Sequence, residues 1–325
     1  MGSSASRKFD PATDLVDLKG KVAIVTGGNA GIGFGTVQHL ARGGAKVYLA
    51  ARNEERATGA IARLREAGYA PGNGEVVWLK LDLSDPRDAK KAAEAFLKKE
   101  ERLDILVNNA GILSGPFEKT SDGVSTMVVV NYISPFVFTR TLLPLLTETA
   151  RKPDSDVRIV NLASITAKLT PSNVSFKTIE DFNVTGRGSL MPGLVRYGHS
   201  KFLDILWTKT LQKRLDAASP PIPITAIAIH PGGVDTFTHR WVFPRFFGWL
   251  VGLFVADVEH GAYTSVFAAA GKGVRERREV YGGMYLESKP VGRIARTRTD
   301  GRVEDERLGR EMWETTERFL EGIGV

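Results

Sequence analysis

Two side chains that can exchange a proton, Tyr197 and Lys201, lie four positions apart in residues 194–215, a stretch with helical apolar spacing. Residues four apart share one face of a helix, so the phenol and the ammonium can meet. A free phenol has a pKa near ~10, and an adjacent positive charge lowers that pKa because it favours the phenolate. The pair could act as an acid or base near neutral pH, although a surface tyrosine beside a solvated lysine has the same spacing.

Two further polar residues could take part in the same chemistry. Ser164 follows a predicted strand at 158–162, and its hydroxyl could hydrogen-bond the same reacting oxygen. Asn131 is an amide among apolar residues, in a helical pattern from about 120 to 146. Such an amide is usually a structural hydrogen-bonding group, and only its context would give it another role.

A nucleotide-binding turn is predicted within residues 20–52. The apolar run at 22–25 is typical of a strand that is buried on both faces of a parallel sheet. Gly27, Gly31 and Gly33 follow in the spacing T-G-x-x-x-G-x-G, before a helix and a second strand at 47–50. Glycines let the backbone approach a phosphate, and the N–H groups that begin the helix can bind it. The glycines alone could mark an ordinary helix start, but the flanking strands favour a dinucleotide site.

Two residues at strand ends bear on which dinucleotide would bind. Arg52 follows the second strand, where an acidic residue would accept the ribose hydroxyls of NAD and an arginine can pair with a 2′-phosphate. The sequence therefore favours NADP. Asp82 follows a third strand at 76–81 and could hydrogen-bond the adenine; its alternative role is a helix N-cap, for which Ser84 and Asp85 are at least as well placed before Pro86.

The order of the predicted elements indicates an α/β fold. Strands are predicted at 22–25, 47–50, 76–81, 103–107, 158–162, 224–229 and 280–286. Helical patterns between them imply right-handed crossovers and a doubly wound, Rossmann-type parallel sheet of seven strands with helices on both faces. We expect one domain: an arm at 1–19, a catalytic domain at 20–290, and a C-terminal helical extension at 291–325 that packs on the same domain.

The motifs taken together resemble the short-chain dehydrogenase/reductase family. They occur in the family's order over residues 19–286: T-G-G-N-A-G-I-G at 26, D-L at 82, N-N-A-G at 108, Asn131, Ser164, Y-G-H-S-K at 197 and P-G-G-V at 231. Three shorter stretches, A-A-R-N at 50, E-H-G-A-Y-T-S at 259 and E-M-W-E-T-T-E-R-F-L at 311, resemble the branch of the retinol dehydrogenases and WW-domain oxidoreductases, although this chain has no WW domain.

The resemblance implies a role for each matching residue. Tyr197 would exchange the substrate proton during hydride transfer, Lys201 would favour the phenolate and hold the nicotinamide ribose, Ser164 would position the substrate oxygen, and Asn131 would maintain a water relay. The residues implied to contact NADP(H) are Gly27, Asn29, Gly31, Ile32, Gly33, Arg52, Asp82, Leu83, Asn109, Ala110, Gly111, Tyr197, Lys201, Pro231, Gly232, Val234 and Thr236.

Two segments depart from the compact family pattern. Ser164 and Tyr197 are 33 positions apart, farther than in compact members, and the extra residues 168–191 could form a substrate-facing loop or a surface excursion indifferent to substrate. Residues 241–256 are the most hydrophobic stretch, too short for a membrane span. As part of a lid at 235–256 they imply a bulky hydrophobic substrate; membrane-surface attachment and a homodimer contact are the alternatives.

Composition excludes several other classes of function. The net charge of +7 comes without a basic run interleaved with aromatics, so we expect no nucleic-acid partner. Absence of cysteine rules out disulfides and thiol nucleophiles, and the five histidines show no close pair, so no metal is expected. We expect a cytoplasmic protein. Gly2 begins a short N-myristoylation pattern, for which a flexible leader or a cloning remnant is the simpler explanation.

These observations predict an NADP(H)-dependent oxidoreductase that interconverts a hydrophobic alcohol and its ketone or aldehyde. Two alternatives remain open. One is a catalytically silent NADP-binding protein that recruits a partner, and the other is an epimerase or double-bond reductase of the same fold.

Overall fold

The computed structural model describes residues 8–232, 261–288, 292–297 and 299–325. The strands are β1 (Val22–Thr26), β2 (Lys46–Ala51), β3 (Glu75–Lys80), β4 (Ile105–Asn108), β5 (Val157–Leu162), β6 (Ile224–His230), β7 (Tyr285–Ser288) and β8 (Ile294–Arg296). The longer helices are α1 (Gly31–Arg42), α2 (Glu54–Ala67), α3 (Pro86–Leu97), α5 (Ser134–Ala150), α6 (Pro192–Asp216), α9 (Tyr263–Ala270) and α12 (Glu306–Gly322). The short helical segments are α4 (Thr126–Val128), η1 (Val129–Ile133), η2 (Ile165–Leu169), η3 (Ile179–Phe182), α10 (Lys272–Glu276), α11 (Arg278–Tyr281) and η5 (Gly301–Glu304).

All described strands join one sheet in the order β3-β2-β1-β4-β5-β6-β7-β8. The first seven are parallel, as predicted, and β8 pairs antiparallel with β7. The predicted count of seven was therefore short by one, and the eighth strand lies in the segment assigned to the C-terminal extension. The prediction also began β7 too early: Val280 lies in α11, and Gly283, with a φ of +71°, turns the chain before the strand starts.

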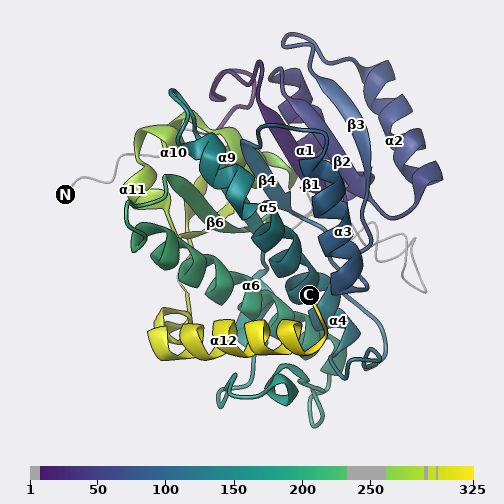
Figure 1. Ribbon diagram of the computed structural model, residues 1–325, viewed down its shortest axis with the longest axis vertical. Helices are drawn as coiled ribbons and strands as arrows, with labels where there is room; N and C mark the ends of the chain where they lie inside the picture. The colour runs from purple at the N-terminus through teal and green to yellow at the C-terminus, as the bar shows by residue number, and fades with distance from the viewer. Residues whose placement is uncertain (1–7, 233–260, 289–291, 298) are drawn as a thin grey trace.

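Helices cover both faces of the sheet, as predicted (Figure 1). On one face, α3, α5 and α6 pack around Phe96, Phe136 and Trp207. On the other, α1, α2 and α9 pack around smaller residues such as Val37 and Ala268. Strand order reverses between β1 and β4, so the loops after these strands diverge at their carboxyl ends. In open α/β sheets the ligand crevice forms at that point.

The described part of the N-terminal arm is packed on the domain. Phe9 is buried, and its ring meets those of Tyr263 and Phe267 edge-on at 6.0 and 5.3 Å. The backbone N–H of Val16 donates to the Ala270 carbonyl at 2.9 Å. Polar composition alone did not predict these contacts, because their partners lie some 250 residues further along the chain.

The C-terminal helix α12 lies across α6, in yellow in Figure 1. It buries Leu308, Met312 and Leu320. The Trp313 ring lies 4.9 Å from that of Phe136. Below it the insertion at 168–191 is partly core: Phe176 and Phe182 are fully buried. The insertion is thus anchored through its middle and is exposed near its end, at 187–191.

One described helical stretch, Thr126–Ala150, has the length and composition of a membrane span, but 72% of its apolar window is buried inside the fold. A core helix of a soluble domain has the same properties. The predicted lid at 235–256 and the apolar stretch at 241–256 lie outside the described residues, as do Val234, Thr236 and Gly2.

Candidate active site

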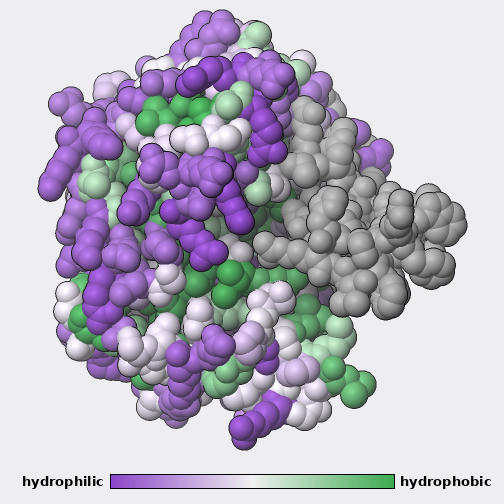
Figure 2. All heavy atoms as spheres, turned by 90° about the vertical axis from the view of Figure 1, so that its right-hand side faces the viewer, coloured by the Kyte–Doolittle hydropathy of each residue, from purple (hydrophilic) through white to green (hydrophobic). Residues whose placement is uncertain are grey.

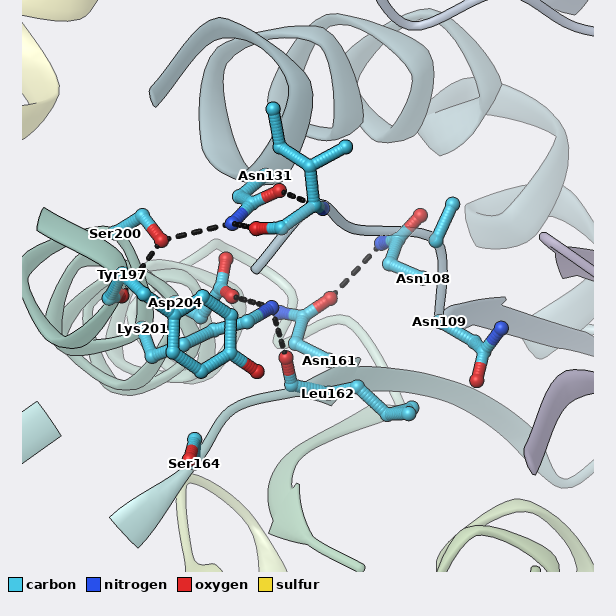
Figure 3. A network of polar contacts seen from close by, with 12 residues as sticks. Asn108, Asn109, Asn131, Asn161, Leu162, Ser164, Tyr197, Ser200, Lys201 and Asp204 are labelled. Carbon is cyan, nitrogen blue, oxygen red and sulfur yellow. Dashed lines mark hydrogen bonds and ion pairs between the residues drawn. The ribbon is translucent and has the colours of Figure 1, made fainter. Parts of the chain in front are cut away.

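Tyr197 and Lys201 lie together on α6, as their spacing predicts, with the Lys201 Nζ 5.7 Å from the centre of the tyrosine ring (Figure 3). Nζ donates hydrogen bonds to the Leu162 carbonyl at 2.6 Å and to Asp204 Oδ2 at 2.9 Å. Lys201 and Asp204 are both buried. Burial alone would lower the pKa of Lys201, but the charge and hydrogen bond of Asp204 raise it, so the lysine stays an ammonium.

Ser164 lies at the end of β5, directly before the short 3-10 helix η2. Its Oγ accepts hydrogen bonds from the Thr166 hydroxyl at 2.9 Å and the Thr166 N–H at 3.3 Å. Since Ser164 is the acceptor in both bonds, its own proton is left to donate. A Cβ on Gly198 would lie 2.2 Å from the Thr166 carbonyl, so the absence of a side chain there lets α6 approach the Ser164 loop.

Asn131 lies in η1, a π-helical turn between α4 and α5. Single π-turns inside α-helices often occur at functional sites. Its amide accepts from the Ile112 N–H at 2.8 Å and donates to the Ile112 carbonyl at 3.0 Å and to Ser200 Oγ at 2.9 Å. The side chain therefore ties the loop after β4 to α6, and the water relay implied by the resemblance stays a prediction.

A second set of amides braces the strands beneath the site. Asn108 donates to Thr139 Oγ1 at 3.0 Å and to Asn161 Oδ1 at 2.9 Å, and Asn161 donates to Thr208 Oγ1 at 2.9 Å. This chain of buried bonds links β4, β5, α5 and α6. Figure 3 shows the bond between Asn108 and Asn161. It fixes the spacing between the strand that carries Ser164 and the helix that carries Tyr197.

The glycine turn after β1 has the shape of a phosphate cradle. Gly27 and Gly31 have φ of +65° and +54°, which favours glycine. A Cβ on Gly33 would lie 2.5 Å from both the Asn109 Nδ2 and the Gly27 carbonyl, so the turn closes only with glycine there. Helix α1 has no side-chain N-cap and no acidic residue in its first turn, leaving its N–H groups for an anion. The cradle fits a dinucleotide phosphate.

The loop after β4 connects the glycine turn to the Tyr197–Lys201 pair. Asn109 donates to the Thr26 carbonyl at 2.7 Å, and the N–H groups of Asn109 and Ala110 donate to the Thr26 hydroxyl, each at 3.0 Å. A Cβ on Gly111 would lie 3.5 Å from the Lys201 Nζ. Residues 109–111 therefore border both the glycine turn and Lys201. This is the arrangement expected if a single bound cofactor extends from the glycine turn to the lysine.

The two residues that bear on the adenosine end lie close together. Arg52 is exposed just after β2. Partial burial opposes ionisation of Asp82, but hydrogen bonds from Ser84 and the positive charge of Arg52 lower its pKa below the usual value. The N-cap of α3 is Asp85, which accepts from the Arg87 N–H at 2.8 Å, so Asp82 is not that cap.

The structure brings most of the predicted site residues to one edge of the sheet. Pro231 and Gly232 follow β6 at that edge, and Leu83 is buried behind Asp82. The residue that the sequence reasoning missed is Asp204. Its signal was present: an acidic residue three positions after Lys201 on the same helix is within reach of the ammonium.

His199, between the catalytic residues, gives a pH-dependent prediction. It is fully buried, and neither ring nitrogen has a hydrogen-bond partner among the residues that the structure describes. Burial, with the charge of Arg302, lowers its pKa to about 4. The unfolded chain takes up the proton near pH ~6.5, so stability should fall as pH drops from ~6.5 to ~4, by about 3 kcal/mol.

Urea unfolding at several pH values measures the slope of the free energy of unfolding against pH, in wild type and in His199→Gln. The glutamine cannot titrate, so the variant should lose this part of the slope whatever its absolute stability. Equal slopes in the two proteins would contradict the assignment to His199.

Comparison with known proteins agrees with this geometry. Residues 21–176 match the sequence model of the short chain dehydrogenases. A short-chain dehydrogenase/reductase of Armillaria gallica is 44% identical over 326 residues, covering 98% of this chain and 98% of its own. Retinol dehydrogenase 11 of Homo sapiens is 33% identical over 305 residues, covering 94% and 87%.

Solved structures share the fold. RhlG of Pseudomonas aeruginosa, solved as an active-site complex with NADP, has a TM-score of 0.64 at 25% identity, over 84% of this chain and 96% of that one. Because these relatives match over nearly their full length, the chain belongs to the short-chain dehydrogenase/reductase family of oxidoreductases, near the retinol dehydrogenases.

Proposed function

We propose that this protein is an NADP(H)-dependent oxidoreductase that interconverts a hydrophobic alcohol and its ketone or aldehyde. The observation that carries the proposal is the placement of Lys201 beneath the Tyr197 ring, with the Ser164 loop packed against the same turn of α6. Buried hydrogen bonds hold the Lys201 ammonium, and Thr166 donates two hydrogen bonds to the Ser164 hydroxyl. A site held this rigidly suits a reaction that needs a proton at a fixed atom.

In the reductive direction, NADPH held by the glycine turn and segment 109–111 would supply the hydride for the carbonyl carbon. The Ser164 hydroxyl donates a hydrogen bond to the substrate oxygen and so orients the carbonyl. Tyr197 gives its phenolic proton to that oxygen as the alkoxide charge develops. The Lys201 ammonium stabilises the phenolate left behind, because an opposite charge at this distance favours the ionised phenol. Oxidation of the alcohol reverses each proton step.

The preference for NADP rests on Arg52. An exposed guanidinium at the end of β2, with no acidic residue in its place, can pair with a 2′-phosphate. Replacing Arg52 with alanine should raise the Kd for NADPH by about tenfold or more, because a hydrogen bond to a charged group contributes about 1.5–3 kcal/mol. The Kd for NADH should change little.

Tryptophan fluorescence or calorimetric titration of both cofactors measures this change. Arg56→Ala, which removes an exposed arginine in the first turn of α2, is the matched control and should leave both Kd values unchanged. Equal weakening of NADPH and NADH by Arg52→Ala would remove the basis for the NADP assignment.

A hydrophobic substrate is supported by the residues around the site. Ile112, in the loop after β4, and Ile165 and Leu169, in η2 after β5, are more than one third exposed. Leu190 and Met191, just before α6, are fully or largely exposed. Arg196 joins these loops, donating to the Gly115 carbonyl at 2.6 Å and the Thr185 carbonyl at 3.1 Å. Figure 2 shows hydrophobic side chains on the face beside the grey atoms.

The direct test is a carbonyl panel ordered by hydrophobicity, with NADPH consumption as the readout. The proposal expects turnover that rises with chain length or ring size and product that carries the hydride on the carbinol carbon. A protein that binds NADPH but consumes none with any carbonyl would instead be a binding protein, and turnover only with conjugated double bonds would indicate a different reductase.

A further inference from the structure

Asp204 places a negative charge where it can act on the catalytic pair. Its Oδ2 accepts from the Lys201 Nζ at 2.9 Å, and both side chains are only 5% exposed. Nζ donates a second hydrogen bond to the Leu162 carbonyl at 2.6 Å. Two of the three ammonium hydrogens are thus fixed, and the third is left for the side on which Tyr197 and Gly111 lie.

A buried carboxylate next to the lysine changes what the lysine does to the phenol. An ammonium alone favours the phenolate, whereas an ammonium paired with a carboxylate presents a dipole whose two charges offset one another at Tyr197. Low dielectric around the pair makes both contributions large. Tyr197 and Lys201 titrate as one coupled pair. With Asp204 present, we expect this pair to lose its proton at a higher pH than it would without the carboxylate.

Two further tyrosines interact electrostatically with this cluster, Tyr132 with Asp204 and Tyr285 with Tyr197, and burial keeps both neutral. Tyr132, on η1, packs against α6, and its hydroxyl shares a hydrogen bond of 2.9 Å with Thr316 Oγ1. Burial raises the pKa of Tyr132 and the charge of Asp204 adds to that, so Tyr132 stays neutral. Burial also raises the pKa of Asp204 to about 6, against the opposing charge of Lys201, so the carboxylate is ionised at and above neutral pH.

We propose that Asp204 is a positioning residue of the active site: its carboxylate anchors the Lys201 ammonium and keeps the proton of the Tyr197–Lys201 pair bound to higher pH. The inference rests on the proposed function for its consequence, which is that Tyr197 can still give its proton to a carbonyl at higher pH. The evidence for it is geometric: Lys201 and Asp204 form a buried ion pair within one helix.

The test removes the charge with little change of shape. Asp204→Asn should lower the pH at which the pair releases its proton by about one unit or more, as expected when a buried charge within ~4–6 Å is removed. The pH of proton release should fall in this variant whether the proton leaves Tyr197 or Lys201. NMR of protein labelled with ¹³Cζ-tyrosine follows the midpoint directly, and Tyr197→Phe assigns the resonance.

The second readout is the pH profile of kcat/KM for carbonyl reduction, whose alkaline limb should move down by the same amount. Asp204→Glu retains the charge and should bring both midpoints back toward the wild-type values. Asp216→Asn removes an exposed carboxylate at the end of the same helix and should move neither. If Asp204→Asn does not fold, Asp204→Ser takes its place, and the same shift of both midpoints is expected.

The NMR titration needs neither cofactor nor turnover, which separates two failures. A midpoint in Asp204→Asn that stays within about 0.3 units of wild type, or rises, overturns the inference even if the enzyme is active. A midpoint that falls as expected, in a protein that reduces no carbonyl, leaves the electrostatic role of Asp204 in place and overturns the proposed function.

Discussion

Replacing Tyr197 with phenylalanine is expected to lower kcat for carbonyl reduction by about 10²- to 10⁴-fold, the usual contribution of a positioned general acid. The ring, and its place beside the Lys201 side chain, would remain, since only the hydroxyl is removed. Without that hydroxyl the developing alkoxide has no proton donor of suitable strength. The Ser164 hydroxyl could still orient the carbonyl but is far too weak an acid to replace the phenol.

The measurement is steady-state turnover together with the Kd for NADPH. The Kd should change by no more than about twofold, because the glycine turn and segment 109–111 are untouched. Tyr281→Phe, which removes a hydroxyl that accepts from Arg277 at 3.3 Å on α11, is the matched control and should keep full activity. A Tyr197→Phe enzyme that retained more than a tenth of wild-type kcat would contradict the acid role.

The parts of the site that were predicted from sequence are those set by local spacing. A glycine turn between a strand and a helix needs only the residues within it, and Tyr197 and Lys201 share a helix face because they are four apart. Residues at the carboxyl ends of parallel strands meet because the sheet brings them to one edge. That is why Asn109, Ser164 and Pro231 could be assigned to one site without knowledge of the coordinates.

What could not be predicted depends on partners distant in sequence. Strand β8 is three residues long, too short for an alternating pattern, and exists because Ile294–Arg296 meets β7. Phe176 reads as an ordinary residue of an insertion, yet it is fully buried and the Thr315 hydroxyl of α12 donates to its carbonyl at 2.6 Å. Asp204 could equally have faced solvent, since an acidic residue in a helix is usually exposed.

Replacing Lys201 with methionine is expected to destabilise the fold by about 3–5 kcal/mol at pH 8, because it leaves the Asp204 carboxylate buried without its partner. The methionine keeps most of the apolar volume of the lysine stem, so loss of packing contributes little. Urea unfolding with matched m-values measures the cost. Activity should also be lost, but stability is the sharper readout, because it does not depend on cofactor or substrate.

The penalty should shrink at lower pH, and the sign follows from the proton balance. Burial places the pKa of Asp204 above its value in the unfolded chain, ~3.9, and removal of the lysine charge raises it further. The folded variant therefore binds a proton that the unfolded chain does not, so its stability rises as pH falls toward ~4. The double variant Lys201→Met/Asp204→Leu should recover most of the loss at pH 8.

Burial, rather than the ion-pair distance, decides how much stability is lost when the lysine of an ion pair is removed. A second lysine of α6, Lys213, forms an exposed ion pair that can be compared with Lys201–Asp204. Lys213 Nζ lies 2.8 Å from Glu306 Oε1, but the two side chains are 54% and 66% exposed. Lys213→Met should therefore leave the free energy of unfolding nearly unchanged, because water stabilises the glutamate that remains. If the two methionine variants lost equal stability, or if the double variant recovered none, Asp204 would not be the buried counter-charge on which the tuning of Tyr197 depends.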